Sequence, residues 1–139
     1  RCGIGHTRWA THGGVTDTNA HPHAYGRVTL VHNGIIENYQ ELAAKYGFGD
    51  KLSSQTDTEV VAALLDYYYE GDPGVAVFQT VRELKGTFAL AVLFEDIPDT
   101  IYAIRNVSPI IAGVGKDAGE SFLASDVTAL TAASVFCAA

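Results

Sequence analysis

The chain has 139 residues, of which 47% are hydrophobic and 18% charged, and its formal net charge is −7. Its length is typical of a single folded domain, and its hydrophobic fraction excludes a disordered chain. The acidic balance argues against nucleic acid as a partner. A membrane span is not expected either, since no apolar run reaches about 18 residues.

The N-terminal part of the chain is predicted to hold two strands joined by a polar loop. Residues 3–10 are expected to form a strand that leads into a loop at 11–24, rich in Gly, Thr, Asn and His. A second strand is expected at 28–31. Asn33-Gly34 would end it abruptly as a turn, because both residue types tolerate positive φ.

Three helices are predicted between residues 36 and 84. The first covers 36–46. Thr56 and Glu59 fit a capping box, in which each side chain satisfies a free N–H of the first turn, so a second helix is expected to about Tyr69. Asp72 followed by a proline predicts the start of a third helix, which would end near Leu84.

After Gly86 the sequence favours strands. Short β-rich runs separated by turns predict an antiparallel meander. These runs are 87–94, 100–105, 110–113 and 121–124. A last helix is expected at 126–133. Strands, then helices, then strands predict an α+β layered fold with antiparallel sheets.

The cysteines and histidines do not predict a metal or a cofactor. Cys2 and Cys137 lie at opposite ends of the chain, which fits neither a disulfide framework nor a metal site and favours a reducing, cytoplasmic setting. All five histidines fall within the first 32 residues, but their spacing matches no standard zinc site. They are predicted to line a pocket or to hydrogen-bond to the backbone.

Arg8 is a candidate ligand for a carboxylate, because a guanidinium presents a planar fork that binds a carboxylate through two hydrogen bonds. Thr11 and His12 would donate to the same anion, and Trp9 would cover it. The alternative is an arginine that pairs with a structural acid, beside a tryptophan that fills the core.

Two further motifs extend this candidate pocket. The side-chain amide of Asn33 and the N–H of Gly34 would form an oxyanion hole, in which each donor stabilises negative charge by roughly 3 kcal/mol; the alternative is a plain turn. Asp57, in the first turn of a helix, would stay ionised and bind an ammonium group; the alternative is a helix cap. A carboxylate, an amine and an amide recognised together predict glutamine as the ligand.

Five stretches of the sequence, GHTRWATHG, NAHPH, VHNGIIENY, TDTEV and FLASD, closely resemble the class II glutamine amidotransferases of the N-terminal-nucleophile type. The resemblance spans nearly the whole chain and weakens after Asp126. It implies a four-layer αββα sandwich of two antiparallel sheets between helical layers, here partial and lacking its first strand. Residues 1–139 would then form part of a glutaminase domain.

The resemblance also implies roles for the candidate residues. Arg8 would bind the α-carboxylate of glutamine and Asp57 its α-amino group, while Asn33 and Gly34 would form the oxyanion hole. Trp9 would belong to a mobile loop that covers the ligand. The residues expected to bind glutamine are Arg8, Trp9, Thr11, His12 and Asp57.

The nucleophile of this family is a cysteine exposed as the first residue of the mature chain, and its own α-amine acts as the general base. Cys2 is not expected to be that cysteine. Arg1 precedes it, and it lies only six residues from Arg8, whereas the family places the two in different parts of the chain. Cys2 is predicted to be a structural strand cysteine, and the chain alone to be inactive.

Within the family, the resemblance is strongest to the branch that aminates fructose 6-phosphate. Ammonia released from glutamine there passes through a channel to a sugar-phosphate isomerase domain. That domain is expected to be absent here, so fructose 6-phosphate would be a partner only through it. A homodimeric parent enzyme and self-association of the fragment are also expected. Two alternatives stay open: a noncatalytic glutamine-binding or docking module, and the glutaminase part of another class II amidotransferase.

Overall fold

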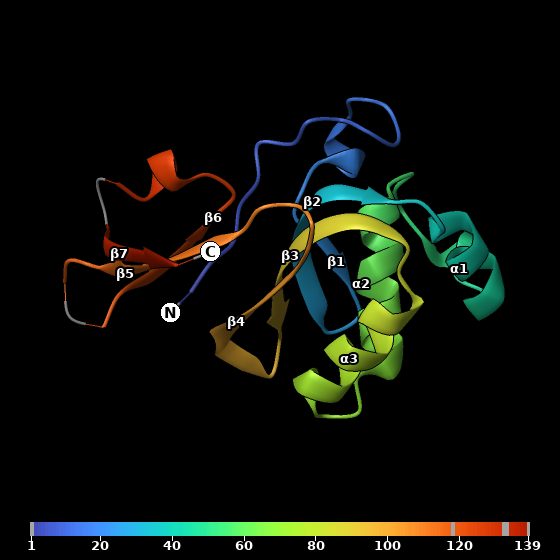
Figure 1. The fold of residues 1–139 in the computed structure, drawn as a ribbon. Helices are drawn as coiled ribbons and strands as arrows, with labels where there is room; N and C mark the ends of the chain where they lie inside the picture. The colour runs from blue at the N-terminus through green and yellow to red at the C-terminus, as the bar shows by residue number, and fades with distance from the viewer. Residues whose placement is uncertain (1, 118, 132–133, 139) are drawn as a thin grey trace.

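Two antiparallel sheets and three α-helices form the part of the chain that the computed structural model describes, residues 2–117, 119–131 and 134–138 (Figure 1). The strands are β1 (His23–Tyr25), β2 (Val28–Ile36), β3 (Gly86–Phe94), β4 (Ile97–Asn106), β5 (Ile111–Gly115), β6 (Ser121–Ala124) and β7 (Ser134–Ala138). The helices are α1 (Tyr39–Tyr46), α2 (Asp57–Tyr68) and α3 (Pro73–Glu83), with short 3-10 turns η1 (Asp17–Asn19), η2 (Gly49–Lys51) and η3 (Val127–Ala129). The predicted α+β class with antiparallel sheets is confirmed.

The first sheet has the strand order β1-β2-β3-β4, with β2 and β3 at its centre. These two strands pair along their whole length, from Val28 opposite Phe94 to Ile36 opposite Gly86. β1 pairs only with the first three residues of β2. Residues 31–36 of β2 therefore have an open edge on the side away from β3.

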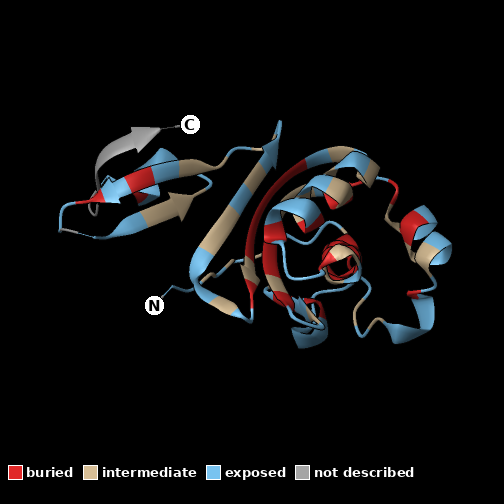
Figure 2. Cartoon of the chain, turned by 90° about the horizontal axis from the view of Figure 1, so that it is seen from below, coloured by how far each residue is buried: buried red, intermediate tan, exposed pale blue. Residues whose placement is uncertain are grey.

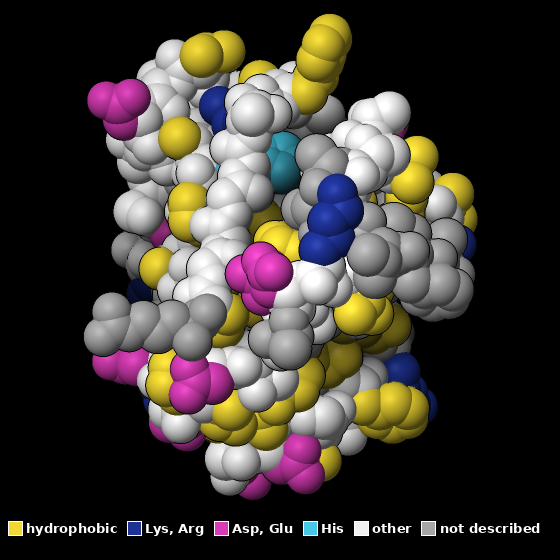
Figure 3. Space-filling view, turned by 90° about the vertical axis from the view of Figure 1, so that its left-hand side faces the viewer, with side chains coloured by type: hydrophobic (Ala, Val, Ile, Leu, Met, Phe, Trp, Pro, Cys, Tyr) yellow, Lys and Arg dark blue, Asp and Glu magenta, His cyan; other side chains and the backbone are white. Residues whose placement is uncertain are grey.

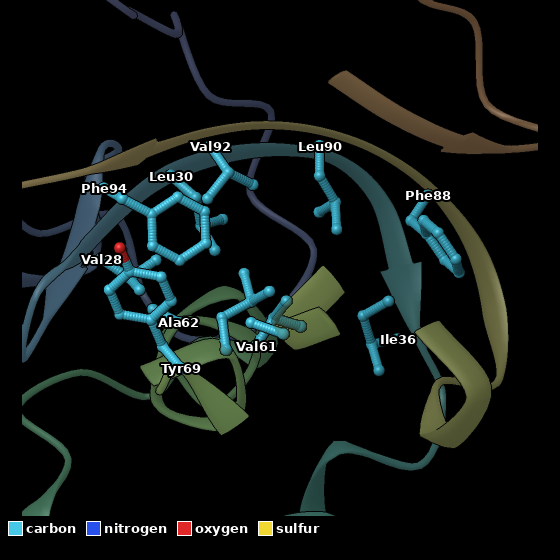
Figure 4. Packing of buried hydrophobic residues seen from close by; sticks show 12 residues of the cluster. Val28, Leu30, Ile36, Val61, Ala62, Tyr69, Phe88, Leu90, Val92 and Phe94 are labelled. Atoms are coloured by element: carbon cyan, nitrogen blue, oxygen red, sulfur yellow. The ribbon is translucent and has the colours of Figure 1, made fainter. Parts of the chain in front are cut away.

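The main core lies between the concave side of this sheet and α2 (Figures 2 and 4). Its strand residues are Val28, Leu30, Ile36, Phe88, Leu90, Val92 and Phe94, and α2 adds Val61, Ala62, Leu65. Each large apolar side chain buried in this way contributes about 1.5–3 kcal/mol to stability. This face of the sheet therefore supplies most of the free energy that holds α2 in place.

The helix boundaries follow the predicted capping signals in part. The side chain of Thr56 accepts a hydrogen bond from the N–H of Glu59, as in a capping box. The carboxylate of Glu59 instead accepts from the N–H groups of Ser53 and Ser54, at 2.9 and 2.6 Å. Only half of the predicted capping box is present, and Glu59 fixes the loop that precedes the helix. Asp72 caps α3 as predicted.

Two predictions near the N-terminus are wrong. Residues 3–10 form no strand. β2 does not end at Asn33-Gly34 but continues to Ile36, because β3 supplies a pairing partner for each of its residues, so α1 begins only at Tyr39. Gly34 has a φ of 134°, and a Cβ there would lie 2.1 Å from the carbonyl oxygen of Thr87. The close approach of β3, and not a turn, requires a glycine at this position.

The second sheet has the order β6-β5-β7 and lies beside β4, on the side of the first sheet away from the helices (Figures 1 and 2). β5 and β6 were predicted, but the strands after Gly86 divide between two sheets and form no single meander. The predicted helix at 126–133 is wrong over the described residues, which show only η3 there; residues 132 and 133 and the side chain of Cys137 lie outside them. The described residues thus show one α-helical layer and two sheets of the expected αββα sandwich.

The face that carries the second sheet is less closely packed than the helical side. Hydrophobic side chains are exposed on it, with acidic side chains among them (Figure 3). β4 has no buried residue, and two cavities of about 240 and 560 Å³ lie between the N-terminal segment, β4 and β6. Judged on the described residues, none of the helices has the length and apolar character needed to cross a membrane.

Candidate functional site

A pocket of about 280 Å³ lies along the open edge of β2. It is formed by the N-terminal loop, β2 and the first turn of α2. The structure brings together at this pocket every residue that the sequence proposed for glutamine binding and for the oxyanion hole. These are Arg8, Trp9, Thr11, His12, Asn33, Gly34 and Asp57.

Arg8 is held by the loop that follows it. Its guanidinium donates from Nη1 to the carbonyl oxygen of Gly14 at 2.9 Å and from Nη2 to that of His12 at 2.8 Å. Among the described residues no carboxylate forms an ion pair with Arg8, so the alternative of a structural acid partner is not supported. A guanidinium has five N–H donors, which leaves donors and an uncompensated positive charge for a ligand.

Trp9 and His12 occupy different positions around the pocket. Trp9 is 91% exposed at its rim, so the alternative of a tryptophan that fills the core is wrong. The imidazole of His12 packs edge-on against Tyr39, and its Nδ1 lies 3.6 Å from Oδ2 of Asp57. His12 therefore contributes a carbonyl oxygen to the support of Arg8, while its side chain faces the acidic end of the pocket.

Asp57 supplies a buried carboxylate at the first position of α2, where it is 3% exposed. Its Oδ2 accepts from the N–H of Ile36 at 2.8 Å, and Oδ1 accepts from the hydroxyl of Thr58 at 3.4 Å. The two histidines near it, His12 and His32, are its closest basic neighbours. Burial lowers the pKa of His32, so that ring is neutral at pH 7 and the carboxylate can accept an ammonium group.

The register of β2 decides where the N–H of Gly34 points. Just beyond the end of β2, the N–H of Glu37 donates to the carbonyl oxygen of Lys85 at 2.9 Å. Successive N–H groups of an antiparallel strand point to opposite sides. Odd-numbered residues of β2 therefore face β3, and even-numbered residues direct their N–H groups to the open edge.

The neighbours of Gly34 on that edge confirm this geometry. The N–H of His32 donates to Nδ1 of His21 at 3.4 Å, and the N–H of Ile36 donates to Asp57. Gly34 lies between these two positions and lines the pocket. Its N–H therefore faces the pocket from a strand edge, which is the placement that an oxyanion hole needs.

Sequence reasoning gave no role to a buried polar network beneath the pocket. Its centre is the hydroxyl of Thr58, which lies 3.3 Å from Nε2 of His21 and 3.2 Å from Nδ1 of His32. Burial, together with the nearby rings of His6 and His23, lowers the pKa of His21 to about 3. The rings of His21 and His32 are thus neutral at pH 7. The signal of the network in the sequence was the unexplained NAHPH stretch.

The histidines contact hydroxyl groups, backbone groups and one another's rings. In the described part of the chain, no group of three or more His, Cys, Asp or Glu side chains has the arrangement to hold a metal ion. The expected absence of a metal stays a prediction.

Cys2 lies apart from this pocket. Its thiol donates to the carbonyl oxygen of Pro98, with a separation of 3.0 Å, and it lines the cavity of about 560 Å³ beside β4. It is not a strand residue as predicted. Among the described residues that line the site pocket, none is a cysteine.

The fold defines the class of protein. Two solved structures share it. One is the glutamine phosphoribosylpyrophosphate amidotransferase from B. subtilis, with a TM-score of 0.70 and 21% sequence identity. The other is the allosteric regulatory enzyme of purine biosynthesis, with a TM-score of 0.74 and 24% sequence identity. Each match covers 93% of this chain and 29% of the other. The chain has the fold of the N-terminal-nucleophile amidotransferases.

Sequence comparison narrows the class to a family. The family model of the glutamine amidotransferase domain matches residues 6–132 of this chain. The chain therefore belongs to this family. It is 51% identical to the glutamine–fructose-6-phosphate aminotransferase (isomerizing) of Caldanaerobacter subterraneus over 131 residues, and 52% identical to that of Thermus thermophilus. These matches cover 92% of this chain but 21% of each relative, so the chain spans about a fifth of their length.

Proposed function

We propose that this chain is the glutamine-hydrolysing part of an enzyme that makes glucosamine 6-phosphate from fructose 6-phosphate and glutamine. The observation that carries the proposal is that the guanidinium of Arg8, the N–H of Gly34 and the carboxylate of Asp57 face one pocket. The high identity to aminotransferases that act on fructose 6-phosphate supports the choice of acceptor.

Each of the three groups matches one part of glutamine. Arg8 binds the α-carboxylate through guanidinium donors that the loop carbonyls leave free. Asp57 binds the α-ammonium group, and its burial strengthens that attraction. The N–H of Gly34, with the side-chain amide of Asn33, binds the oxygen of the side-chain amide as it gains negative charge. Trp9 covers the ligand from the rim, and Thr11 and His12 complete the binding site.

In the proposed reaction a cysteine thiolate attacks the amide carbon of glutamine. Ammonia leaves, and water then releases glutamate from the thioester. The family resemblance assigns this thiolate to the N-terminal cysteine of the mature parent enzyme. Cys2 is directed toward Pro98 and away from the pocket, and we propose that these 139 residues alone bind glutamine without hydrolysing it.

The remaining proposals concern the parent enzyme. Ammonia would reach fructose 6-phosphate in a separate isomerase domain, the parent would be a homodimer, and it would work in the cytoplasm. Residues 1–139 would be part of its glutaminase domain, and this part alone would self-associate. The exposed hydrophobic side chains beside β4 support self-association (Figure 3).

A second candidate is a noncatalytic module that binds glutamine. The observation that favours it is the absence of cysteine among the described residues that line the pocket. Hydrolysis of glutamine by the full-length protein would exclude this alternative, whereas binding without hydrolysis would support it. Use of an acceptor other than fructose 6-phosphate would instead point to another class II branch.

Isothermal titration calorimetry with L-glutamine, L-glutamate and D-glutamine tests the proposal. We expect the chain to bind L-glutamine and L-glutamate, to bind D-glutamine at least tenfold more weakly, and to release no glutamate over hours. Failure to bind L-glutamine, or equal affinity for both enantiomers, would overturn the proposed pocket. Glutamate release that is lost in Cys2→Ala would show that Cys2 is the nucleophile after all.

A further inference from the structure

Asn19 joins the two sides of the pocket through one buried side chain. It is 3% exposed, begins the NAHPH stretch and is the last residue of η1, before β1 starts at His23. Its Nδ2 donates to the carbonyl oxygen of Gly14 at 3.0 Å, and its Oδ1 accepts from the N–H of Gln55 at 2.9 Å. The amide thus ties the N-terminal loop to the segment that leads into α2.

Both partners of Asn19 are next to residues that bind the ligand. The carbonyl oxygen of Gly14 also accepts from Nη1 of Arg8 at 2.9 Å, so Asn19 and Arg8 share one acceptor. A carbonyl oxygen has two lone pairs and can accept both bonds. On the other side, Gln55 precedes Asp57 by two residues. Asn19 is therefore a buried link between the arginine and the aspartate, in addition to His12, whose carbonyl oxygen accepts from Arg8 and whose ring lies 3.6 Å from Asp57.

A glycine at position 13 lets the side-chain amide of Asn19 come close to the N-terminal loop. Gly13 has a φ of 75°, and a Cβ there would lie 2.7 Å from Nδ2 of Asn19 and 3.0 Å from Cβ of Gln55. A larger residue at position 13 would push the loop away from Asn19. The close contact between loop and amide thus depends on a glycine with a left-handed backbone.

The two histidines of the same stretch extend the link along α2. Nε2 of His23 lies 3.1 Å from the hydroxyl of Thr56, and Nε2 of His21 lies 3.3 Å from that of Thr58. With the contact of Asn19, the stretch touches residues 55, 56 and 58, which surround Asp57.

We propose that Asn19 is a positioning residue that sets the distance between Arg8 and Asp57, and so matches the pocket to the α-carboxylate and α-ammonium of one amino acid. The inference rests on the proposed function of this pocket. Because the loop is held before the ligand arrives, less conformational freedom is lost on binding. Without Asn19, the guanidinium of Arg8 keeps its charge, but the loop carbonyl of Gly14 that helps to position it is no longer held.

A test without ligand uses trypsin, which cleaves after arginine. Asn19→Asp keeps the acceptor for the N–H of Gln55 but replaces by an oxygen the Nδ2 that donates to the carbonyl oxygen of Gly14 and to Oε1 of Gln55. Asn19→Ala removes all three side-chain contacts. Asn38 provides the matched control, since its Nδ2 donates to the carbonyl oxygen of Glu83 at 2.8 Å and its Oδ1 accepts from the N–H of Lys85 at 2.9 Å.

Both Asn19 variants should be cleaved at the Arg8–Trp9 bond at least about tenfold faster than the wild-type chain, because cleavage requires release of the arginine. Asn38→Asp and Asn38→Ala should lower the melting temperature by a similar amount without faster cleavage at Arg8. Equal cleavage rates at this bond in Asn19 and Asn38 variants would overturn the inference.

A double-mutant cycle with L-glutamine tests whether Asn19 acts through Arg8. Asn19→Asp should weaken binding about tenfold in the wild-type chain but less than twofold in an Arg8→Lys background. A full tenfold loss in both backgrounds would show a merely structural role. If the wild-type chain binds no glutamine but Asn19 still protects the Arg8–Trp9 bond from trypsin, the proposed function fails and the positioning of Arg8 by Asn19 stands. If the chain binds no glutamine and Asn19 gives no protection, both the proposed function and this inference are wrong.

Discussion

The first turn of α2 and the turns that follow it are equally buried but chemically opposite. Residues 56–59 are polar and at most 3% exposed, whereas residues 60–65 are apolar and at most 1% exposed. Burial of the apolar residues stabilises the fold, whereas burial of the polar ones costs free energy unless each group finds a partner. One helix therefore holds both the main stabilising contacts and the least favourable ones.

The partners of the polar turn explain why it is tolerated. Glu59 accepts from the backbone of residues 53 and 54, Thr56 contacts His23, and Asp57 accepts from the backbone of β2. These bonds satisfy the polar atoms but leave the charge of Asp57 without a lysine or arginine partner among the described residues. The apolar residues 60–65 thus supply the stability of α2, and the polar residues 56–59 at its start can keep a charge that is available to a ligand.

The largest effect is expected in the apolar turns. Leu65→Ala removes a side chain that is 1% exposed in the main core, and should lower the free energy of unfolding by about 2–5 kcal/mol in urea denaturation. Val75→Ala, at an exposed position of α3, should change it by less than about 0.5 kcal/mol. Equal effects would mean that the core is not where stability resides.

The next effect concerns the hydroxyl under the pocket. Thr58→Val removes the group shared by His21 and His32 and should cost about 1–3 kcal/mol of unfolding free energy. Thr80 is the matched control, because it is equally buried but its hydroxyl has no hydrogen-bond partner among the described residues. Thr80→Val should be neutral or stabilising, and a loss as large as that of Thr58→Val would contradict the network.

A third variant separates binding from stability. Asp57→Asn keeps an acceptor for the N–H of Ile36 but removes the charge, so glutamine should bind at least about tenfold more weakly, a loss of about 1.4 kcal/mol. The free energy of unfolding should fall by less than about 1 kcal/mol, because the variant also removes the cost of burying a charge that has no lysine or arginine partner among the described residues. Asp66→Asn, which breaks the ion pair with Arg27, should leave the affinity for glutamine unchanged.

A further effect should appear as a dependence on pH. The pKa of His21 is lowered from 6.5 to about 3, mainly by burial, so protons bind the unfolded chain more readily. Stability should be complete above about pH 6.5 and fall as the pH drops toward 3. His21→Gln should reduce the change in melting temperature between about pH 7 and pH 5. An unchanged slope would show that the pKa of His21 is the same in the folded and in the unfolded chain.

The same contrast explains what the sequence could predict. α2 and α3 were recognisable because their caps and apolar spacing are local. Arg8, Gly34 and Asp57 were singled out because their chemistry together matches one ligand and their motifs resemble a known family, whereas each alone also fits a structural role. The extension of β2 through Gly34 was not, since it depends on pairing with β3, about fifty residues away in the chain. Residues 3–10 have short-range strand character but pair with no strand among the described residues.

The supporting residues were missed for the same reason. Asn19, His21 and Thr58 each have their partners in another segment, and nothing in their own spacing indicates those contacts. The second sheet shows the same limit, because β7 (Ser134–Ala138) forms by pairing with β5, and no strand was predicted there.

The central claim is that the pocket holds a free amino acid at both ends, by Arg8 and by Asp57. Calorimetry with two glutamine analogues, one without the α-amine and one with an α-carboxamide, tests it most directly. Asp57→Asn should weaken binding of the analogue without an amine by less than twofold, and Arg8→Lys should weaken binding of the α-carboxamide by less than twofold. Each variant should weaken binding of glutamine at least about tenfold. Equal losses for glutamine and for both analogues would contradict the assignment.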